Sequence, residues 1–266
     1  MMLRDFMEEY LPRIEQELQN CLPPDSAYPE DLHGAMRYSV LGGGKRLRAL
    51  LAIAAAKMVA GDDFPGIEDA ICRYAAAAEM LHAYTLIHDD LPCMDDDDFR
   101  RGKPANHKVY GEGLAVLAGD ALLTEAFALL MELVDLNVAT ERVVEITKEL
   151  AYAAGSRGLI GGQAVDLDSE GKAIDANVLE YIHTHKTGAL FQAVLRAGGL
   201  IAGASRAGLD AITLYAHSFG LLFQITDDIL DVVGDEAKLG KKVGSDTQAL
   251  KATYVSLHGL DQARVL

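Results

Sequence analysis

The sequence of 266 residues has no tryptophan, only three cysteines and only seven prolines. The cysteines (Cys21, Cys72 and Cys93) are odd in number and form no CxxC pair, which argues against a disulfide framework. A reducing cytoplasm is therefore the expected location. All seven prolines lie within the first 104 positions. Because proline removes a backbone donor and clashes inside a helix, the rest of the chain is open to long uninterrupted helices.

Positive charge is also scarce. The chain has 24 lysine and arginine residues against 40 aspartate and glutamate residues, which gives a net charge of −16. Nucleic acid and anionic lipid both require a cationic field, so neither is expected as a partner. The first ten residues are charged and lack the apolar core of a signal peptide. The longest apolar stretches, such as residues 49–56, are too short to cross a bilayer, and we expect no membrane insertion.

Apolar residues recur at helical spacing almost throughout, whereas alternation of the strand type is scarce. Long helices are predicted over residues 47–61, 67–90, 113–134, 175–203 and 208–235. The second of these is apolar nearly all round and is expected at the centre of the fold. We find no linker and no internal repeat, so the prediction is an all-α protein with a single domain over residues 1–266.

The densest charge lies in "HDDLPCMDDDDFRRGK", residues 88–103, which follows the apolar run "MLHAYTLI". Carboxylates beside an apolar core require cations, so the segment predicts a metal site next to a basic clamp for an anion. Asp89 and Asp95 are six residues apart and would not share a face of a regular helix. Pro92 must distort the last helical turn, which allows Asp95 to turn toward Asp89.

A second acidic cluster, "QITDDILD", covers residues 224–231. Asp227 and Asp231 are one helical turn apart, so their carboxylates share a face at a spacing that suits Mg²⁺. Acidic runs are often only solvated, and this alternative stays open for Asp96, Asp97 and Asp98. Neither cluster has the pattern of a calcium-binding loop.

Several basic segments are candidates for holding phosphate. In "GGGKRLR", residues 42–48, glycines expose backbone donors just before a helix, and Lys45 and Arg48 share its first turn. Arg100 and Arg101 follow the first acidic cluster, and guanidinium groups suit phosphate oxygens. His82 lies between one and two turns before Asp89 and is a candidate hydrogen-bond donor. Further candidates are Lys186, Thr187, Lys241, Lys242 and Lys251.

These motifs together resemble the trans-type polyprenyl diphosphate synthases, and within them the bacterial farnesyl diphosphate synthase group. The resemblance covers most of the chain, from residue 32 onward, and also rests on "GGQAVDL", "HKTGAL" and "GKKVGSD". It implies an isoprenoid-synthase-type helical bundle around a central cavity, a homodimer, and several Mg²⁺ ions, with Mn²⁺ as a possible substitute. Relatives usually continue for one or two helices beyond the position of Leu266, so either the sequence is incomplete or the body is naturally short.

The resemblance also implies roles for individual residues. Asp89, Asp95 and Asp227 correspond to metal ligands, supported by Asp90, Asp228 and Asp231. The isopentenyl diphosphate site corresponds to Lys45, Arg48, His82 and Arg101. Positions around the allylic diphosphate correspond to Arg100, Lys186, Thr187, Gln224 and Lys241, and a polar pair lining the cavity to Gln163 and Asp166.

The implied reaction condenses isopentenyl diphosphate with dimethylallyl or geranyl diphosphate by ionisation, condensation and elimination. Tyr84, with the smaller Thr85 beside it, is expected to close the tail pocket at the length of a farnesyl chain. A geranyl or a geranylgeranyl (longer-chain) diphosphate synthase remains the closest alternative, and a non-catalytic partner subunit is the alternative from another class. A terpene cyclase is disfavoured, because the second motif keeps all three of its aspartates.

Overall fold

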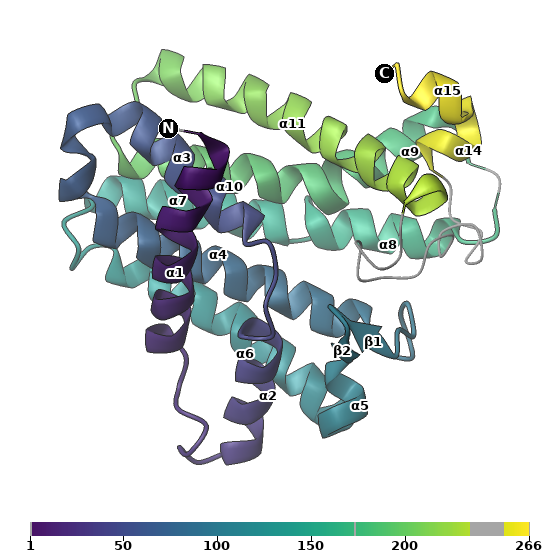
Figure 1. Cartoon of the computed structure of the whole chain (residues 1–266), viewed down its shortest axis with the longest axis horizontal. Helices are drawn as coiled ribbons and strands as arrows, with labels where there is room; N and C mark the ends of the chain where they lie inside the picture. Colours follow the sequence, from purple (N-terminus) through teal and green to yellow (C-terminus); the bar gives the residue numbers. More distant parts are fainter. Residues whose placement is uncertain (1, 173, 235–252, 266) are drawn as a thin grey trace. The chain divides into compact units, whose positions relative to one another are not determined.

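The computed structural model describes residues 2–172, 174–234 and 253–265 (Figure 1). It divides into two compact units, Met1–Thr147 with Val194–Leu209 and Lys148–Ala193 with Asp210–Leu266. Within the described ranges, the one sheet is a hairpin of β1 (Phe99–Arg100) and β2 (Lys103–Pro104), and the other regular elements are helices. The all-α prediction is confirmed, whereas the single domain stays a prediction.

The centre of the first unit is α4 (Glu68–Asp89), in which fifteen residues are buried. Around it pack α1 (Leu3–Cys21), α2 (Glu30–Val40), α3 (Leu47–Ala60) and α6 (Glu112–Glu132) (Figure 1). Four consecutive alanines, residues 75–78, are all buried and let the neighbouring helices approach α4 on every side. The predicted central helix over residues 67–90 is thus confirmed. The shorter elements of this unit are η1 (Gly61–Gly66), α5 (Asn106–Tyr110) and the first half of α7 (Thr140–Ala154).

One helix of the described residues, α6, is long and apolar enough to cross a membrane by length and hydropathy alone. The sequence expectation considered uninterrupted apolar stretches, whereas this helix qualifies with Asp120 and Glu125 inside its apolar sequence. One face of α6 packs along α4. On the other side lie exposed apolar side chains, namely Val116, Leu117 and Met131, with Val134 just beyond the helix.

The second unit contains α8 (Leu159–Ser169), α9 (Ala176–Ile182), η2 (His183–Gly188), α14 (Tyr254–His258) and α15 (Leu260–Ala263). The helices α10 (Ala189–Ile201) and α11 (Arg206–Val233) each have one part in either unit. The ring of Phe191 on α10 packs against Phe219 and Phe223 of α11 at centroid distances of 5.2 and 5.0 Å. The helical run predicted over residues 175–203 contains a π-helix, η2, which hydrophobic periodicity does not reveal.

Candidate functional site

The first aspartate motif begins where α4 ends. Beyond Asp89 the chain turns back, so that the amide of Asp95 donates a hydrogen bond to the carbonyl oxygen of Asp89 at 2.9 Å. The amide of Asp96 likewise donates to the carbonyl oxygen of Leu91 at 3.1 Å. This is the turn that Pro92 was expected to produce, and it brings Asp95 beside Asp89 with both side chains half-buried.

The next aspartate, Asp90, is held by an arginine. It is 2% exposed and accepts a hydrogen bond from Nε of Arg100 at 2.8 Å, and Nη2 of Arg100 also contacts Asp97 at 3.0 Å. Burial raises the pKa of Asp90, and the hydrogen bond from Arg100 opposes that rise. Burial alone would lower the pKa of Arg100, but its hydrogen bond to Asp90 raises it. Arg100 therefore acts here as the counter-ion of the motif.

The remaining aspartates of the run, Asp96 to Asp98, are exposed. Asp98 forms a surface ion pair with Lys108 at 2.6 Å, and Asp97 reaches Arg100. Surface pairs of this kind contribute little to stability. The solvated alternative, which the sequence left open for these three residues, agrees with their exposure.

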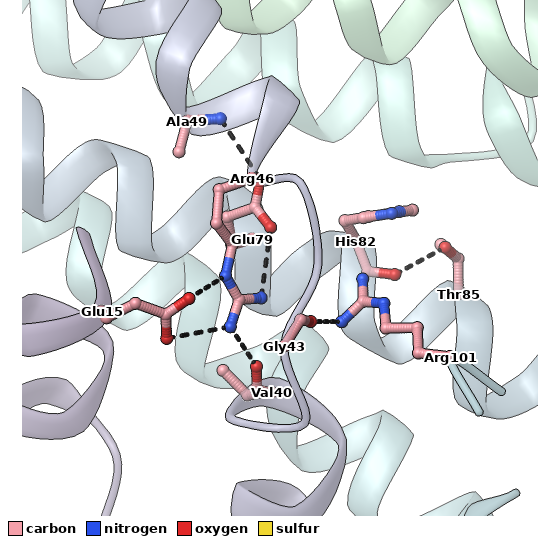
Figure 2. Close-up of polar contacts among 9 residues, drawn as sticks. All are labelled: Glu15, Val40, Gly43, Arg46, Ala49, Glu79, His82, Thr85 and Arg101. Carbon is pink, nitrogen blue, oxygen red and sulfur yellow. Dashed lines mark hydrogen bonds and ion pairs between the residues drawn. The ribbon is translucent and has the colours of Figure 1, made fainter. Parts of the chain in front are cut away.

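A basic cluster lies in the same unit, and we call Lys45, Arg48, His82 and Arg101 the clamp. Figure 2 shows His82 on α4 and Arg101 reaching the loop before α3, where its Nη1 donates to the carbonyl oxygen of Gly43. Gly43 and Gly44 have φ angles of 92° and 138°, and a Cβ on Gly44 would lie 2.8 Å from the guanidinium carbon of Arg101. Glycine is needed there because the loop adopts a conformation that other residues avoid and approaches Arg101 closely.

The electrostatics of the clamp favour an anion. Desolvation, followed by the charges of Arg48 and Arg101, lowers the pKa of His82 well below its ordinary value, so its imidazole is neutral. Burial, with Arg101 adding to it, lowers the pKa of Arg48 to about 10. Burial and the charge of Arg46 lower the pKa of Arg101 in the same way. Nδ1 of His82 is buried and has no hydrogen-bond partner among the described residues. A bound anion would relieve each of these costs.

The second aspartate motif lies on α11. Asp228 and Asp231 are each 1% exposed, whereas Asp227 is half-buried. The carboxylate of Asp228 accepts hydrogen bonds from the amide of Tyr254 at 2.7 Å and from Nε2 of Gln224 at 2.9 Å. It also lies 3.7 Å from Nε2 of His183. Asp228 thus holds the chain around the motif, and Asp227 is the more accessible ligand.

The polar residues of the second unit are joined in pairs. Nζ of Lys186 contacts Asp166 at 2.6 Å, and the hydroxyl of Thr187 donates to Gln224 at 3.1 Å. Both Lys186 and Thr187 belong to the π-helix η2, an element that often occurs at functional sites. A Cβ on Gly162 would overlap the backbone nitrogen of Lys186, so this glycine is required for the close approach.

Two further predicted positions can be placed. Gln163, expected to line the cavity with Asp166, is 7% exposed, and neither amide atom of its side chain has a hydrogen-bond partner among the described residues. Such a buried amide is costly unless a ligand or water satisfies it. Lys241, Lys242 and Lys251 lie outside the described residues.

The predicted chain-length residues lie on α4, one turn before the first motif. Tyr84 is 4% exposed, and its hydroxyl has no partner within the described part of the chain. Burial, with the charge of Asp89, raises the pKa of Tyr84 to about 12. The ring of Tyr84 packs edge-on against His88, and Thr85 donates a hydrogen bond to the carbonyl oxygen of His82. Tyr84 therefore keeps its proton and acts as a bulky side chain.

Sequence reasoning missed Arg46 and Glu79. Arg46 was passed over between Lys45 and Arg48, yet its side chain is 1% exposed and bound to Glu15 and Glu79 (Figure 2). Glu79 did carry a signal in the sequence, because it is the one charged residue in the run "AAAAEMLHA". A charged residue in such a run is almost never buried without a partner.

The donor set of the two motifs suits a hard cation. Its candidate ligands are carboxylate oxygens, the type of ligand that Mg²⁺ prefers. Within the described residues, no three histidine, cysteine or acidic side chains already converge as a metal site. Asp89 and Asp95 of the first motif and Asp227 of the second, all half-buried, are the accessible carboxylates of this type.

Comparison with known proteins gives consistent matches. The sequence profile of the family described as "Polyprenyl synthetase" matches residues 29–265. Farnesyl diphosphate synthase of Escherichia coli (strain K12) is 47% identical over 97% of this chain and 85% of its own. A chloroplastic geranylgeranyl pyrophosphate synthase of Catharanthus roseus is 48% identical over 89% of this chain and 65% of its own.

A solved structure extends these matches to the fold. Geranyltransferase from Helicobacter pylori, complexed with magnesium and isoprenyl diphosphate, superposes with a TM-score of 0.87 at 34% identity. The match covers 98% of this chain and 85% of that one. An all-α chain with two aspartate motifs and a basic clamp has the features of a prenyltransferase. The chain belongs to the polyprenyl synthetase family.

Proposed function

We propose that the protein condenses isopentenyl diphosphate with dimethylallyl or geranyl diphosphate to give farnesyl diphosphate. The observation that carries the proposal is the clamp, in which Arg48 and Arg101 lie beside a neutral His82 with a buried, unpartnered Nδ1. A diphosphate supplies the negative charge and the acceptor atoms that such a cluster favours. The relative from Escherichia coli bears the name of this activity.

The metal requirement follows from the donor set. Several Mg²⁺ ions, with Mn²⁺ as a substitute, would be held by Asp89, Asp95 and Asp227. These three ligands would be supported by Asp90, Asp228 and Asp231. When bound, the metal supplies Lewis-acid stabilisation of charge on a departing diphosphate. Magnesium is present with an isoprenyl diphosphate in the structural relative from Helicobacter pylori.

The residues of the chain bind and orient the two substrates. The clamp holds the diphosphate of isopentenyl diphosphate, while Arg100, Lys186, Thr187, Gln224 and Lys241 hold the allylic diphosphate. The carbon–oxygen bond of the allylic diphosphate breaks, and the double bond of isopentenyl diphosphate attacks the resulting allylic cation. A proton then leaves the new chain, with the released diphosphate as its acceptor. No protein nucleophile is required, and apolar walls exclude water from the cation.

Tyr84 sets the product length in this proposal. It is a buried aromatic side chain one turn before the first motif, where a growing tail along α4 would meet it. We expect Tyr84→Ala to yield products longer than farnesyl diphosphate, because truncation opens the pocket. Chromatography of the dephosphorylated products measures the length, and products of unchanged length contradict this role. Tyr84→Phe, which keeps the bulky ring, is the control and should leave the product length unchanged.

The protein is further proposed to be a cytoplasmic homodimer. The exposed apolar residues Val116, Leu117 and Met131 give α6 a face suited to pack on a second copy. All three cysteines are free, in keeping with a reducing compartment. Light scattering coupled to gel filtration tests the dimer, and Leu117→Asp should reduce the measured mass. A mass of one chain for the unchanged protein contradicts it.

The direct test of the function uses the purified protein with isopentenyl diphosphate, Mg²⁺ and dimethylallyl or geranyl diphosphate. The expected result is farnesyl diphosphate, identified by chromatography after dephosphorylation. Geranylgeranyl diphosphate as the main product would favour the longer-chain alternative. No prenyl product would contradict the enzyme and favour a non-catalytic partner subunit.

A further inference from the structure

We infer that Glu79, together with Arg46 and Glu15, is a positioning device that holds the clamp in its binding geometry. The inference rests on the proposed function of the clamp as the isopentenyl diphosphate site. Glu79 lies on α4, three residues before His82, and is 2% exposed (Figure 2). Glu79 is not one of the positions assigned to substrate, although its charge acts on Arg48 and Arg101. It joins the two chain segments that carry the clamp.

The side chain of Arg46 is held by protein groups on all three of its nitrogens. Its Nε donates to Glu15 at 2.7 Å, and Nη2 donates to Glu15 at 3.1 Å and to the carbonyl oxygen of Val40 at 2.7 Å. Its Nη1 lies 3.5 Å from Oε2 of Glu79. With a side chain that is 1% exposed, Arg46 is an anchor, although it stands between the two phosphate candidates Lys45 and Arg48.

The backbone at the anchor explains why it is needed. Arg46 has a φ of 48° and a ψ of 36°, a left-handed conformation that residues other than glycine rarely adopt. Such a conformation persists only when its surroundings hold it in place. Oε1 of Glu79 also accepts a hydrogen bond from the amide of Ala49 at 3.2 Å, in the first turn of α3. The left-handed turn and the start of α3 are thereby tied to α4, which places Lys45 and Arg48 relative to His82.

Charge and position give opposite predictions for Glu79. If the carboxylate acted only through its charge, Glu79→Gln would make the clamp more positive and tighten diphosphate binding. If the carboxylate positions the clamp, the loss of its bond to Arg46 loosens the turn and weakens binding. A contribution to the stability of the fold alone would lower the melting temperature and leave affinity unchanged.

The experiment measures the affinity for isopentenyl diphosphate by calorimetry without an allylic partner, so that no turnover occurs. We expect Glu79→Gln to raise the Kd roughly tenfold or more, since it weakens an ion pair and a hydrogen bond made by a buried charged group. KM for the allylic substrate should change much less than KM for isopentenyl diphosphate. Glu15→Gln, at a side chain that is 38% exposed, should shift the Kd in the same direction by less and is the variant to use if Glu79→Gln does not fold.

Glu17→Gln is the matched control. It removes the ion pair between Glu17 on α1, the helix that carries Glu15, and Arg73 on α4, the helix that carries Glu79, at 2.6 Å. It should lower the melting temperature and leave the Kd unchanged. An unchanged or smaller Kd in Glu79→Gln, or in Glu15→Gln where only that variant folds, overturns the inference. If the protein without substitutions fails to bind isopentenyl diphosphate, the proposed function and the inference are both overturned. If Arg101→Met loses binding while Glu79→Gln binds normally, only the inference is overturned.

Discussion

The two units hold their charged residues in opposite ways. In the first, burial and the charges of neighbouring arginines lower the pKa of Arg48 and of Arg101. In the second, Lys186 is already paired with Asp166, and Thr187 with Gln224. The clamp is therefore a preformed anion site, whereas a ligand of Lys186 must replace Asp166. The difference predicts distinct responses to mutation in the two units.

The largest expected effect is on turnover, at the first aspartate motif. Asp89→Ala should slow product formation by at least ~1000-fold, about 4 kcal/mol of barrier, because charge on the departing diphosphate loses its metal. Asp227→Ala should match it if both units supply ligands to one reaction. Asp98→Asn, at an exposed residue of the same acidic run, is the control and should turn over normally. Near-normal turnover in Asp89→Ala would show that the run is only a solvated surface.

An intermediate effect is expected at Gly162. Because an added Cβ would overlap the backbone of Lys186, Gly162→Ala should displace η2 and lower kcat/KM for the allylic substrate roughly tenfold or more. Gly113→Ala is the control, since a Cβ there meets no atom within 4 Å. A steady-state assay against each substrate in turn measures the effect. Equal losses of kcat/KM for both substrates would contradict the assignment of η2 to the allylic substrate.

The smallest effect concerns stability and pH at His183. Burial lowers the pKa of His183 to about 4, against an ordinary value of 6.5. Above pH 6.5 its contribution to stability is complete, and as the pH falls toward 4 the unfolded chain binds a proton first, so the free energy of unfolding drops. We expect His183→Phe to reduce the slope of the free energy of unfolding against pH, measured by urea titrations from pH 7.5 to 4.5. His217→Phe, at an exposed site on the same unit, should leave the slope unchanged, and equal slopes in both variants would contradict the assignment.

Local signals in the sequence sufficed for the central helix and for the turn of the first motif. The central helix was predictable because its residues are apolar on every face, and the turn at Asp95 because Pro92 cannot continue a helix. The π-helix was not predictable, since it depends on Gly162 leaving room for Lys186. Such contacts are tertiary and leave no periodic pattern.

The roles of single residues around the clamp were likewise not predictable from local sequence. Lys45, Arg46 and Arg48 look equivalent in the sequence, and only the left-handed turn at Arg46 separates the anchor from its neighbours. Glu79 could have been found, because a carboxylate inside an alanine-rich run requires a buried partner. Which partner it meets depends on the loop before α3, and the sequence does not specify that loop's path.

The most direct test of the account is the pair of KM values for Arg101→Met and Lys186→Met, each measured against isopentenyl diphosphate and against geranyl diphosphate. If the clamp binds isopentenyl diphosphate, Arg101→Met raises KM for isopentenyl diphosphate and leaves KM for geranyl diphosphate nearly unchanged. Lys186→Met should do the converse. Equal shifts for both substrates in both variants, or no shift in either, would contradict the assignment of the clamp to isopentenyl diphosphate.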